Sequence, residues 1–471
     1  MKTECKPKRI EFQALGNREV VGKFNGGMIT SDAAGLLLRE TEHRTGTIKR
    51  FSQCFTDFRN QNHIEHTVSE LLSPRIYGLA LGYEDLNDHD MLRNDPLLAV
   101  LCEKQEPTGV DRKCIRDKGK ALAGKSTLNR IELTNLDADE KSRYKKIVVQ
   151  PEKVDHLFVD IFIKSHNKEP EQIILDVDAT DDTLYGNQEG RFFHGYYKEY
   201  CYLPLYIFCQ DHLLCARLRP SDIDGAKGTV EELKRIVPQI RESWPNVKII
   251  LRGDSGFCRE DIMVWCEENK VDFVLGLAKN ERLKKKIKED LVYAKLMYTT
   301  SGRASRIYDD FFYKTRRSWN RSRRVISKAE HLQKGSNPRY VVTSLSHEEA
   351  DAAFLYVNIY CARGEMENRI KEQQLYLFAD RTSTSKIRSN QIRLYFSSIA
   401  YLLVSSFRRL ALKGTQMSKA QCHTIRLKLF KIGAQITVTV RKVWVSLAEG
   451  YPYREIFLKI YKNLLKLPLP V

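Results

Sequence analysis

Two short apolar segments that each end in an aspartate constrain the fold of this chain more than any other feature. Residues 172–178 read QIILDVD, and residues 247–254 read VKIILRGD. Short runs of this kind, rich in β-branched residues, predict buried strands. Further strands are predicted at 202–209 and 213–219, joined by a tight hairpin, and at 272–278, with helices at 227–242 and 259–269. This order predicts an α/β fold in which helices flank a mixed sheet, with a hairpin edge on otherwise parallel strands.

The remaining sequence divides into segments of different pattern. Residues 1–170 predict a mostly helical region, with helices near 31–38, 70–81 and 154–165. Residues 280–349 begin with a basic stretch and then turn β-rich, so we expect an inserted subdomain there. Helix is predicted again at 351–378 and 391–412, and residues 424–447 form a basic amphipathic segment, either helical or mixed. The expected boundaries are 1–170, 171–279, 280–349, 350–415 and 416–471.

The charge of the chain limits its partners. Among 471 residues, 78 lysines and arginines face 60 aspartates and glutamates, a formal net charge of +18. That surplus favours a polyanion, either nucleic acid or an acidic membrane surface. The longest apolar run, 394–404, contains two serines and is shorter than the roughly 18–20 residues of a membrane span. The start lacks a secretory signal and the 11 cysteines form no CxxC pair, so we expect a cytoplasmic protein without a membrane partner.

Carboxylates at the predicted strand ends suit metal-dependent phosphoryl transfer. Open α/β sheets place their sites at the carboxyl ends of strands, and paired Mg²⁺ ions in such reactions need hard oxygen ligands. Asp178 and Asp254 stand at these positions, and glycines flank Asp254 closely enough to let a phosphate backbone approach. Asp176 shares a strand face with Asp178, so its part in metal binding stays open. The alternative is that these aspartates only cap turns.

Three residues of the predicted helix 351–378 share one face. Tyr360, Arg363 and Glu367 lie three and four residues apart, which is the spacing of neighbours on a helix surface. An ordinary Arg–Glu pair on a solvated helix, worth about 0.3–0.5 kcal/mol, is the alternative. The surrounding sequence GEMEN suits a purely structural helix poorly, which favours a functional role.

Taken together, these groups resemble the DDE transposases of bacterial insertion sequences. The spacing Tyr360-x2-Arg363-x3-Glu367 is similar to their tyrosine–arginine–glutamate signature, and the segments around Asp178 and Asp254 look like their two aspartate motifs. The strings LDVDATDD, RGDSGF, RGEMENRIKE and FADRTS most resemble the thirteen-eighty family of insertion sequences. The resemblance covers residues 24–447.

One position departs from the family pattern. The signature lysine, expected seven residues after the glutamate, is Gln374 in this chain, and Lys371 lies one turn from Glu367. Lys371 is therefore the candidate to replace the family lysine as a DNA contact.

The resemblance implies a fold, a reaction and partners. It implies an RNase H-like catalytic domain in 171–279 and 350–415, interrupted by the β-rich insertion, after an N-terminal region that binds DNA ends. Asp178, Asp254 and Glu367 would bind two Mg²⁺ ions, for which Mn²⁺ substitutes, while Tyr360 and Arg363 would hold a phosphate. Water would cleave the transposon end, and the freed 3′-hydroxyl would then attack target DNA. A homodimer on double-stranded DNA is implied as well.

A basic segment at 314–324 is a second candidate DNA contact. It reads KTRRSWNRSRR, and its candidate residues are Arg316, Arg317, Trp319, Arg321, Arg323 and Arg324. Arginines of this kind grip phosphates, and a tryptophan stacks on an unpaired base. A solvated hairpin face is the alternative.

Two further motifs predict no site. Residues 119–126 match the P-loop pattern GxxxxGKS, but a P-loop needs a buried strand before it, and residues 111–118 are charged. We instead expect a helix start whose Lys125 and Arg130 lie near DNA phosphates. His63 and His66 form a lone HxxH without a third ligand, and we expect both to be surface residues.

Three alternatives to a transposase remain open from the sequence. The first is a nuclease of the same fold that hydrolyses DNA without joining it. The second is a catalytically inactive, transposase-derived DNA-binding protein, and the third is an ATPase that uses the P-loop match.

Overall fold

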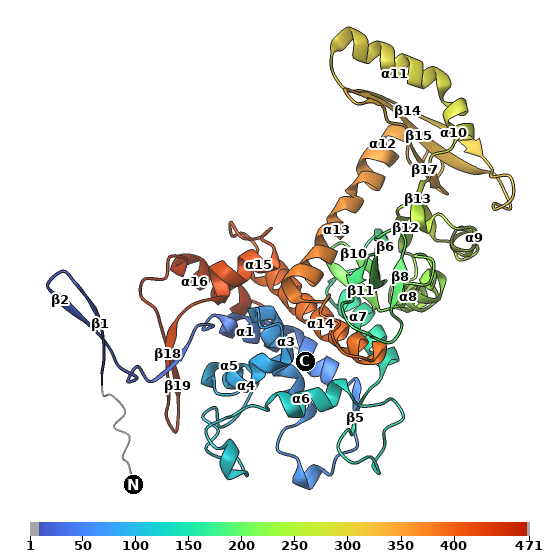
Figure 1. Cartoon of the computed structure of the whole chain (residues 1–471). Coiled ribbons are helices and arrows are strands. Elements are labelled where there is room, and N and C mark those ends of the chain that lie inside the picture. The colour runs from blue at the N-terminus through green and yellow to red at the C-terminus, as the bar shows by residue number, and fades with distance from the viewer. Residues whose placement is uncertain (1–8, 469–471) are drawn as a thin grey trace. The chain divides into compact units, whose positions relative to one another are not determined.

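The computed structural model describes residues 9–468, and its Cα positions group into two compact units (Figure 1). As far as the structure describes them, the first unit contains Met1–Ser52, Asp57–Val148 and Ser406–Val471, and the second contains Gln53–Thr56 and Val149–Ser405. The predicted α/β segment lies in the second unit. The main segment of the second unit extends from Val149 to Ser405, whereas the expected catalytic domain comprised 171–279 and 350–415. The N-terminal and C-terminal parts of the chain together form the first unit.

The second unit is built on a large mixed sheet. In the described part of the chain this sheet has nine strands, in the order β11-β10-β6-β12-β13-β17-β15-β14, with β16 paired to β15. The strands are β6 (Gln172–Ala179), β10 (Leu205–Cys209), β11 (His212–Arg217), β12 (Lys248–Gly253), β13 (Asp272–Leu277), β14 (Ser305–Tyr313), β15 (Arg323–Leu332), β16 (Gly335–Ser336) and β17 (Arg339–Thr343). Only β6, β12 and β13 pair in parallel, and the other ladders are antiparallel.

Helices cover both faces of this sheet. The helices of the second unit are α7 (Pro151–Lys164), α8 (Thr229–Ser243), α9 (Glu260–Glu268), α10 (Glu281–Lys286), α11 (Lys288–Ser301), α12 (Ala352–Phe354), α13 (Gly364–Lys371) and α14 (Ile387–Ala411), of which α14 continues into the first unit. Alternate strand residues such as Leu175 and Leu251 pack in one core with α7, α8 and α9. The residues between them, such as Ile250 and Val274, pack with residues 350–359 on the other face. A small sheet beside these layers contains β7 (Asp182–Thr183), β9 (Glu199–Tyr202) and β8 (Phe192–His194).

Most of the predicted elements of the α/β segment are confirmed within a few residues, but residues 280–349 differ from the expected subdomain. The segment contributes helices α10 and α11, and its strands continue the main sheet instead of forming a separate one. Strand β17 pairs with β13 from Leu277↔Tyr340 to Val274↔Thr343. Buried valines at 341 and 342 enter the cores on the two faces. The insertion therefore closes the exposed edge of β13, which would otherwise leave backbone groups unpaired.

The first unit is mostly helical. Its helices are α1 (Gly35–Thr45), α2 (Thr47–Ser52), α3 (Val68–Leu81), α4 (His89–Leu92), α5 (Pro96–Leu101), α6 (Lys125–Glu132), α15 (Cys422–Ile425) and α16 (Arg454–Leu465). The strands are β1 (Ile10–Leu15), β2 (Arg18–Gly22), β3 (Met28–Thr30), β18 (Ala434–Val438) and β19 (Val443–Leu447), while β4 (Phe55–Asp57) pairs with β5 (Ile147–Val149) where the chain passes between units. Strand β18 pairs with both β19 and β3. The C-terminal segment is therefore not helical throughout, because a β-hairpin at 434–447 joins an N-terminal strand.

In the part of the chain that the structure describes, no helix combines the length and the apolar character needed to cross a bilayer.

Candidate active site

The strand register places Asp178 beside Asp254. Strands β6 and β12 are parallel neighbours, in which Asp176 faces Arg252 and Val177 faces Gly253. The next residues on the two strands are Asp178 and Asp254. Both carboxylates therefore stand at the same end of the sheet, on adjacent strands, as the carboxyl-end rule for such sheets predicts.

A tight turn holds Asp254 in place. Its Oδ1 accepts a hydrogen bond of 2.8 Å from the backbone N–H of Gly256, at the start of the short helical turn Ser255–Phe257. A Cβ on Gly256 would stand 2.9 Å from that oxygen, so any larger residue would push the carboxylate away. The turn itself therefore requires glycine at position 256.

Asp176 and Asp178 share a strand face but have different surroundings. Asp176 is 4% exposed and accepts hydrogen bonds of 2.5 and 2.7 Å from Arg252, which is 6% exposed and also donates to the carbonyl of Ile359. Burial raises the pKa of Asp176, and the Arg252 guanidinium opposes that rise. Arg252 donates hydrogen bonds to both oxygens of Asp176, so this carboxylate has a structural role.

Asp178 is less enclosed than Asp176 and lies in an acidic setting. One oxygen accepts a hydrogen bond of 2.9 Å from the Ala179 N–H, and the other lies 3.3 Å from Nη1 of Arg363. Burial raises the pKa of Asp178 to about 6; Arg363 opposes this rise, while the charges of Asp254 and Glu367 add to it. Concentrated negative charge of this kind favours a cation.

One helical rod carries the remaining predicted residues. Between α12 and α13 the chain forms a π-helical turn at Leu355–Tyr360 and a 3₁₀ turn at Cys361–Arg363, and Figure 1 shows the whole as a continuous rod. Irregular turns of this kind inside helices are frequent at functional sites. The guanidinium of Arg363 bridges Asp178, at 3.3 Å, and Glu367, at 2.8 Å. The rod and the sheet edge therefore share one ion-pair network.

Tyr360 reaches the same edge of the sheet. A Cβ placed on Gly276 would lie 2.6 Å from the Tyr360 hydroxyl and 2.8 Å from the backbone nitrogen of Ser255. The hydroxyl thus lies next to the turn that follows Asp254. Burial raises the pKa of Tyr360, so the hydroxyl is a hydrogen-bond donor at neutral pH.

The donor chemistry of the three acids fits a hard cation such as Mg²⁺, which prefers carboxylate oxygens. In this conformation, however, no three His, Cys, Asp or Glu side chains of residues 9–468 converge closely enough to hold a metal ion. The guanidinium of Arg363 stands between Asp178 and Glu367 and neutralises part of their charge. Joint metal binding by Asp178, Asp254 and Glu367 therefore requires these carboxylates to move closer together.

The family lysine position is used for an internal contact. Gln374 donates hydrogen bonds of 2.9 Å to the carbonyl of Asp181 and to Oδ1 of Asp182. Burial raises the pKa of Asp182 to about 8, so this carboxyl is mostly protonated at neutral pH. Lys371 is exposed, and its contact with DNA stays a prediction.

The basic segment 314–324 differs from the predicted stacking and phosphate-gripping surface. Trp319 is only 5% exposed and packs edge-on against Tyr313, with 5.8 Å between ring centroids. The prediction that Trp319 stacks on a DNA base is therefore wrong in this conformation. Arg316 and Arg317 are exposed, and Arg321 is exposed but pairs with Glu267.

Arg323 and Arg324 are likewise buried, which corrects their prediction as phosphate contacts. Arg323 is 4% exposed and pairs with Glu260 and Glu267 of α9, both at 2.7 Å. Arg324 is hydrogen-bonded to Asp310 and to backbone carbonyls near residue 346. The acidic partners of Arg323 lie 56 and 63 residues away in the chain, so the local sequence gave no sign of them.

The two rejected motifs have different outcomes. Residues 111–118 contain no strand, only a short helical turn at Ile115–Asp117, and Lys125 pairs with Asp90 at 3.2 Å. The absence of a P-loop strand is thus confirmed for these residues. His63 is exposed as predicted, but His66 is buried and the prediction for it is wrong.

Sequence reasoning missed Arg252, although its position opposite the first aspartate strand was a usable signal. In the string LRGDS it stands two residues before Asp254, just as Asp176 stands two residues before Asp178. Two such strands paired in parallel bring Arg252 against Asp176.

Comparison with known proteins gives the chain a family. Residues 12–469 match the family model described as "Transposase DDE domain group 1". No curated protein matches the sequence. Among solved structures, the chain is similar to the piggyBac transposase in a cryo-EM synaptic complex with hairpin DNA, with 13% identity, a TM-score of 0.40, and coverage of 85% of this chain and 80% of that one. Since the family model spans nearly the whole sequence, the chain belongs to the DDE transposases of group 1.

Proposed function

We propose that this transposase cuts DNA at the ends of a bacterial insertion sequence and joins the freed 3′-hydroxyl to target DNA. The observation that carries the proposal is the placement of Asp178 and Asp254 on adjacent parallel strands, with Glu367 linked to Asp178 through Arg363. A large mixed sheet with helices on both faces is compatible with an RNase H-like catalytic domain. Membership of a transposase family supports DNA as the substrate.

Each residue of the network has a role in this proposal. Asp178, Asp254 and Glu367 would hold two Mg²⁺ ions, or Mn²⁺ in their place, which would supply activation of the attacking oxygen and stabilisation of the leaving oxygen. Arg363 already lies between two of these acids and can donate to a phosphate oxygen through its planar fork of N–H groups. The Tyr360 hydroxyl would orient the same phosphate.

The partners follow from the reaction. Double-stranded DNA is bound twice, first as the element's ends and then as target. Because two ends must be held together before joining, we propose a homodimer on DNA. The net charge of +18 supports binding to a polyanion of this kind.

A cleavage assay with matched variants tests the site. Asp254→Ala and Glu367→Ala should each abolish cleavage of end DNA in Mg²⁺ while leaving DNA affinity within a few-fold, because affinity comes mainly from lysine and arginine contacts to phosphate. Glu365→Ala is the control, since Glu365 is an exposed acid two residues away on the same helix. Substantial cleavage by either active-site variant would overturn the assignment.

A second assay separates the transposase from its rivals. A precut end with a free 3′-hydroxyl should be joined to a plasmid target by the wild-type protein. Cleavage without joining would indicate a nuclease of the same fold. Tight binding to end DNA with neither activity would indicate a catalytically inactive DNA-binding protein.

A further inference from the structure

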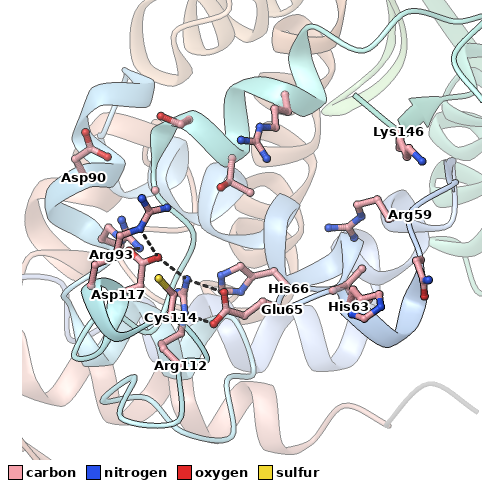
Figure 2. Close-up of a pocket in the computed structure, with 17 residues that line it drawn as sticks. Arg59, His63, Glu65, His66, Asp90, Arg93, Arg112, Cys114, Asp117 and Lys146 are labelled. Carbon is pink, nitrogen blue, oxygen red and sulfur yellow. Dashed lines mark hydrogen bonds and ion pairs between the residues drawn. The ribbon is translucent and has the colours of Figure 1, made fainter. Parts of the chain in front are cut away.

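The first unit contains a polar pocket that the proposed reaction does not use. Its volume is about 700 Å³. Figure 2 shows the lining side chains, which come from the loops around α4 and α6 and from residues 59–66. The lining residues with polar or charged side chains are Arg59, Asn60, His63, Glu65, His66, Asp90, Arg93, Arg112, Arg116, Asp117, Ser126, Thr127, Arg130 and Lys146. All of them belong to one compact unit, so the pocket is formed by that unit alone.

The pocket carries a surplus of positive charge. Five arginines and one lysine line it against three carboxylates, which leaves a net charge of +3 with neutral histidines. The carboxylates are already paired. Glu65 pairs with Arg112 at 2.8 Å and Asp117 with Arg93 at 3.0 Å (Figure 2). Asp90 pairs at 3.2 Å with Lys125, which does not line the pocket. Little of their charge is therefore left to repel an anion.

Arg130 supplies an unpaired cation at the rim. It is exposed, and no carboxylate of residues 9–468 forms an ion pair with it; its guanidinium lies 5.3 Å from the ring centroid of Tyr144. Helix α6 begins at this pocket. Its N-cap residue is Gly124, which has no side chain to cap the first backbone N–H groups. The positive end of the helix dipole adds to the field at the same place.

His66 is the feature that points to a ligand. The side chain lines the pocket and is only 5% exposed, yet neither ring nitrogen has a hydrogen-bond partner among the described residues. Nε of Arg93 is also buried there without a partner. Burial and the charges of Arg112 and Lys104 lower the pKa of His66 to about 4, so the imidazole is neutral and offers one N–H donor. Buried polar groups are normally satisfied, and an anion in the pocket would accept from both side chains.

We propose that this pocket binds a phosphate group of DNA, at a site separate from the carboxylates of the second unit. A phosphate oxygen accepts from the buried His66 and Arg93 donors, while Arg130 and Lys146 face the remaining oxygens. The volume leaves room for the adjoining sugar as well as the phosphate. Phosphate recognition follows from the pocket itself, and the choice of DNA as its source rests on the proposed function.

A salt series on matched variants tests the proposal. The variant Arg130→Gln removes the unpaired rim cation, and Arg143→Gln is the control because Arg143 lies over the same Tyr144 ring, at 4.9 Å, but does not line the pocket. Binding of a fluorescent 30-base-pair duplex is followed by anisotropy between roughly 50 and 200 mM salt. Each lost phosphate contact flattens the slope of log affinity against log salt by about 0.9, so Arg130→Gln should lose about one unit and Arg143→Gln none.

A second variant and a second probe complete the test. His66→Phe keeps an aromatic ring and removes both nitrogens, and it should weaken duplex binding several-fold. Inorganic phosphate, titrated by calorimetry, should bind the wild-type protein more weakly than the duplex and should lose affinity in both pocket variants. Phosphate binding that depends on Arg130 with an unchanged duplex slope would overturn DNA as the source.

Unchanged affinity of Arg130→Gln for both probes would overturn the pocket as an anion site. These results do not depend on the proposed chemistry, since Asp254→Ala should keep the wild-type salt slope. Failure of the pocket and failure of the active site are therefore distinguishable.

Discussion

Replacing Asp176 with alanine would leave the guanidinium of Arg252 buried without its carboxylate. Both residues are buried, at 4% and 6% exposure, and two hydrogen bonds join their side chains. Removing one partner of a buried ion pair costs about 3–5 kcal/mol, because the other charge stays desolvated and uncompensated. With an m value of about 3 kcal/mol/M, the urea midpoint of the second unit should fall by about 1–1.7 M.

The tryptophans make this shift measurable in the right part of the molecule. Trp244, Trp265 and Trp319 are buried in the second unit, whereas Trp444 is exposed in the first. Tryptophan emission during urea unfolding therefore follows mainly the second unit, which matters because a chain of two units need not unfold in one step.

Two further variants serve as controls for Asp176→Ala. Asp178→Ala should change the free energy of unfolding by about 1 kcal/mol or less. Removing this partly exposed carboxylate eliminates one ion pair, but it also removes repulsion from nearby acids. The double variant Asp176→Leu, Arg252→Met should recover much of the stability, since apolar replacement of a buried pair is often nearly neutral.

Activity then separates the two aspartates. Asp176→Ala should retain cleavage at temperatures where it is folded, whereas Asp178→Ala should have none. A wild-type urea midpoint for Asp176→Ala, or a large loss of stability in Asp178→Ala, would refute the assignment of one residue to structure and the other to chemistry.

The remaining predictions concern the basic segment, acid stability and the P-loop match. Trp319→Ala should lower the stability of the second unit by about 3–5 kcal/mol through lost core packing, and a normal melting temperature would show that the ring is not buried. Arg323→Ala should lower the free energy of unfolding by about 2–3 kcal/mol without changing the salt slope of DNA binding. Replacing the exposed Arg316 by alanine should flatten that slope by up to about 0.9 if Arg316 contacts phosphate. A flatter slope and unchanged stability in Arg323→Ala would instead show that Arg323 lies on the surface and contacts DNA. The pKa of His66 falls from 6.5 to about 4 on folding. Its contribution to the free energy of unfolding is therefore complete above pH 6.5 and is lost as the pH falls towards 4, by up to about 3 kcal/mol. Thermal unfolding across this pH range should show less acid lability in His66→Gln than in the wild type, and identical profiles would contradict the assignment. Lys125→Ala should change neither ATP affinity nor cleavage, and cleavage that requires ATP would prove the P-loop functional.

Local pattern was enough for the elements that carry the candidate site. Short apolar runs that end in aspartate predicted β6 and β12 nearly to the residue, and the three- and four-residue spacing predicted a shared helix face for Arg363 and Glu367, which form an ion pair in the structure. These features depend on the composition of short runs and on the helix period, which are properties of neighbouring residues in the chain. The sequence likewise showed that no strand feeds residues 119–126.

Contacts between distant residues were decided by the tertiary structure alone. The register that sets Asp178 beside Asp254, and Arg252 against Asp176, joins strands more than 70 residues apart. Trp319 is buried against Tyr313, Arg323 is paired with acids of α9, and the pocket around His66 depends on loops folding together. Periodicity tells which side of an element a residue occupies, but not which element will cover that side. The sequence by itself therefore determined which residues are candidates for the chemistry, and the packing of strands and helices decided that Arg252 binds both oxygens of Asp176 while Asp178 stays less enclosed.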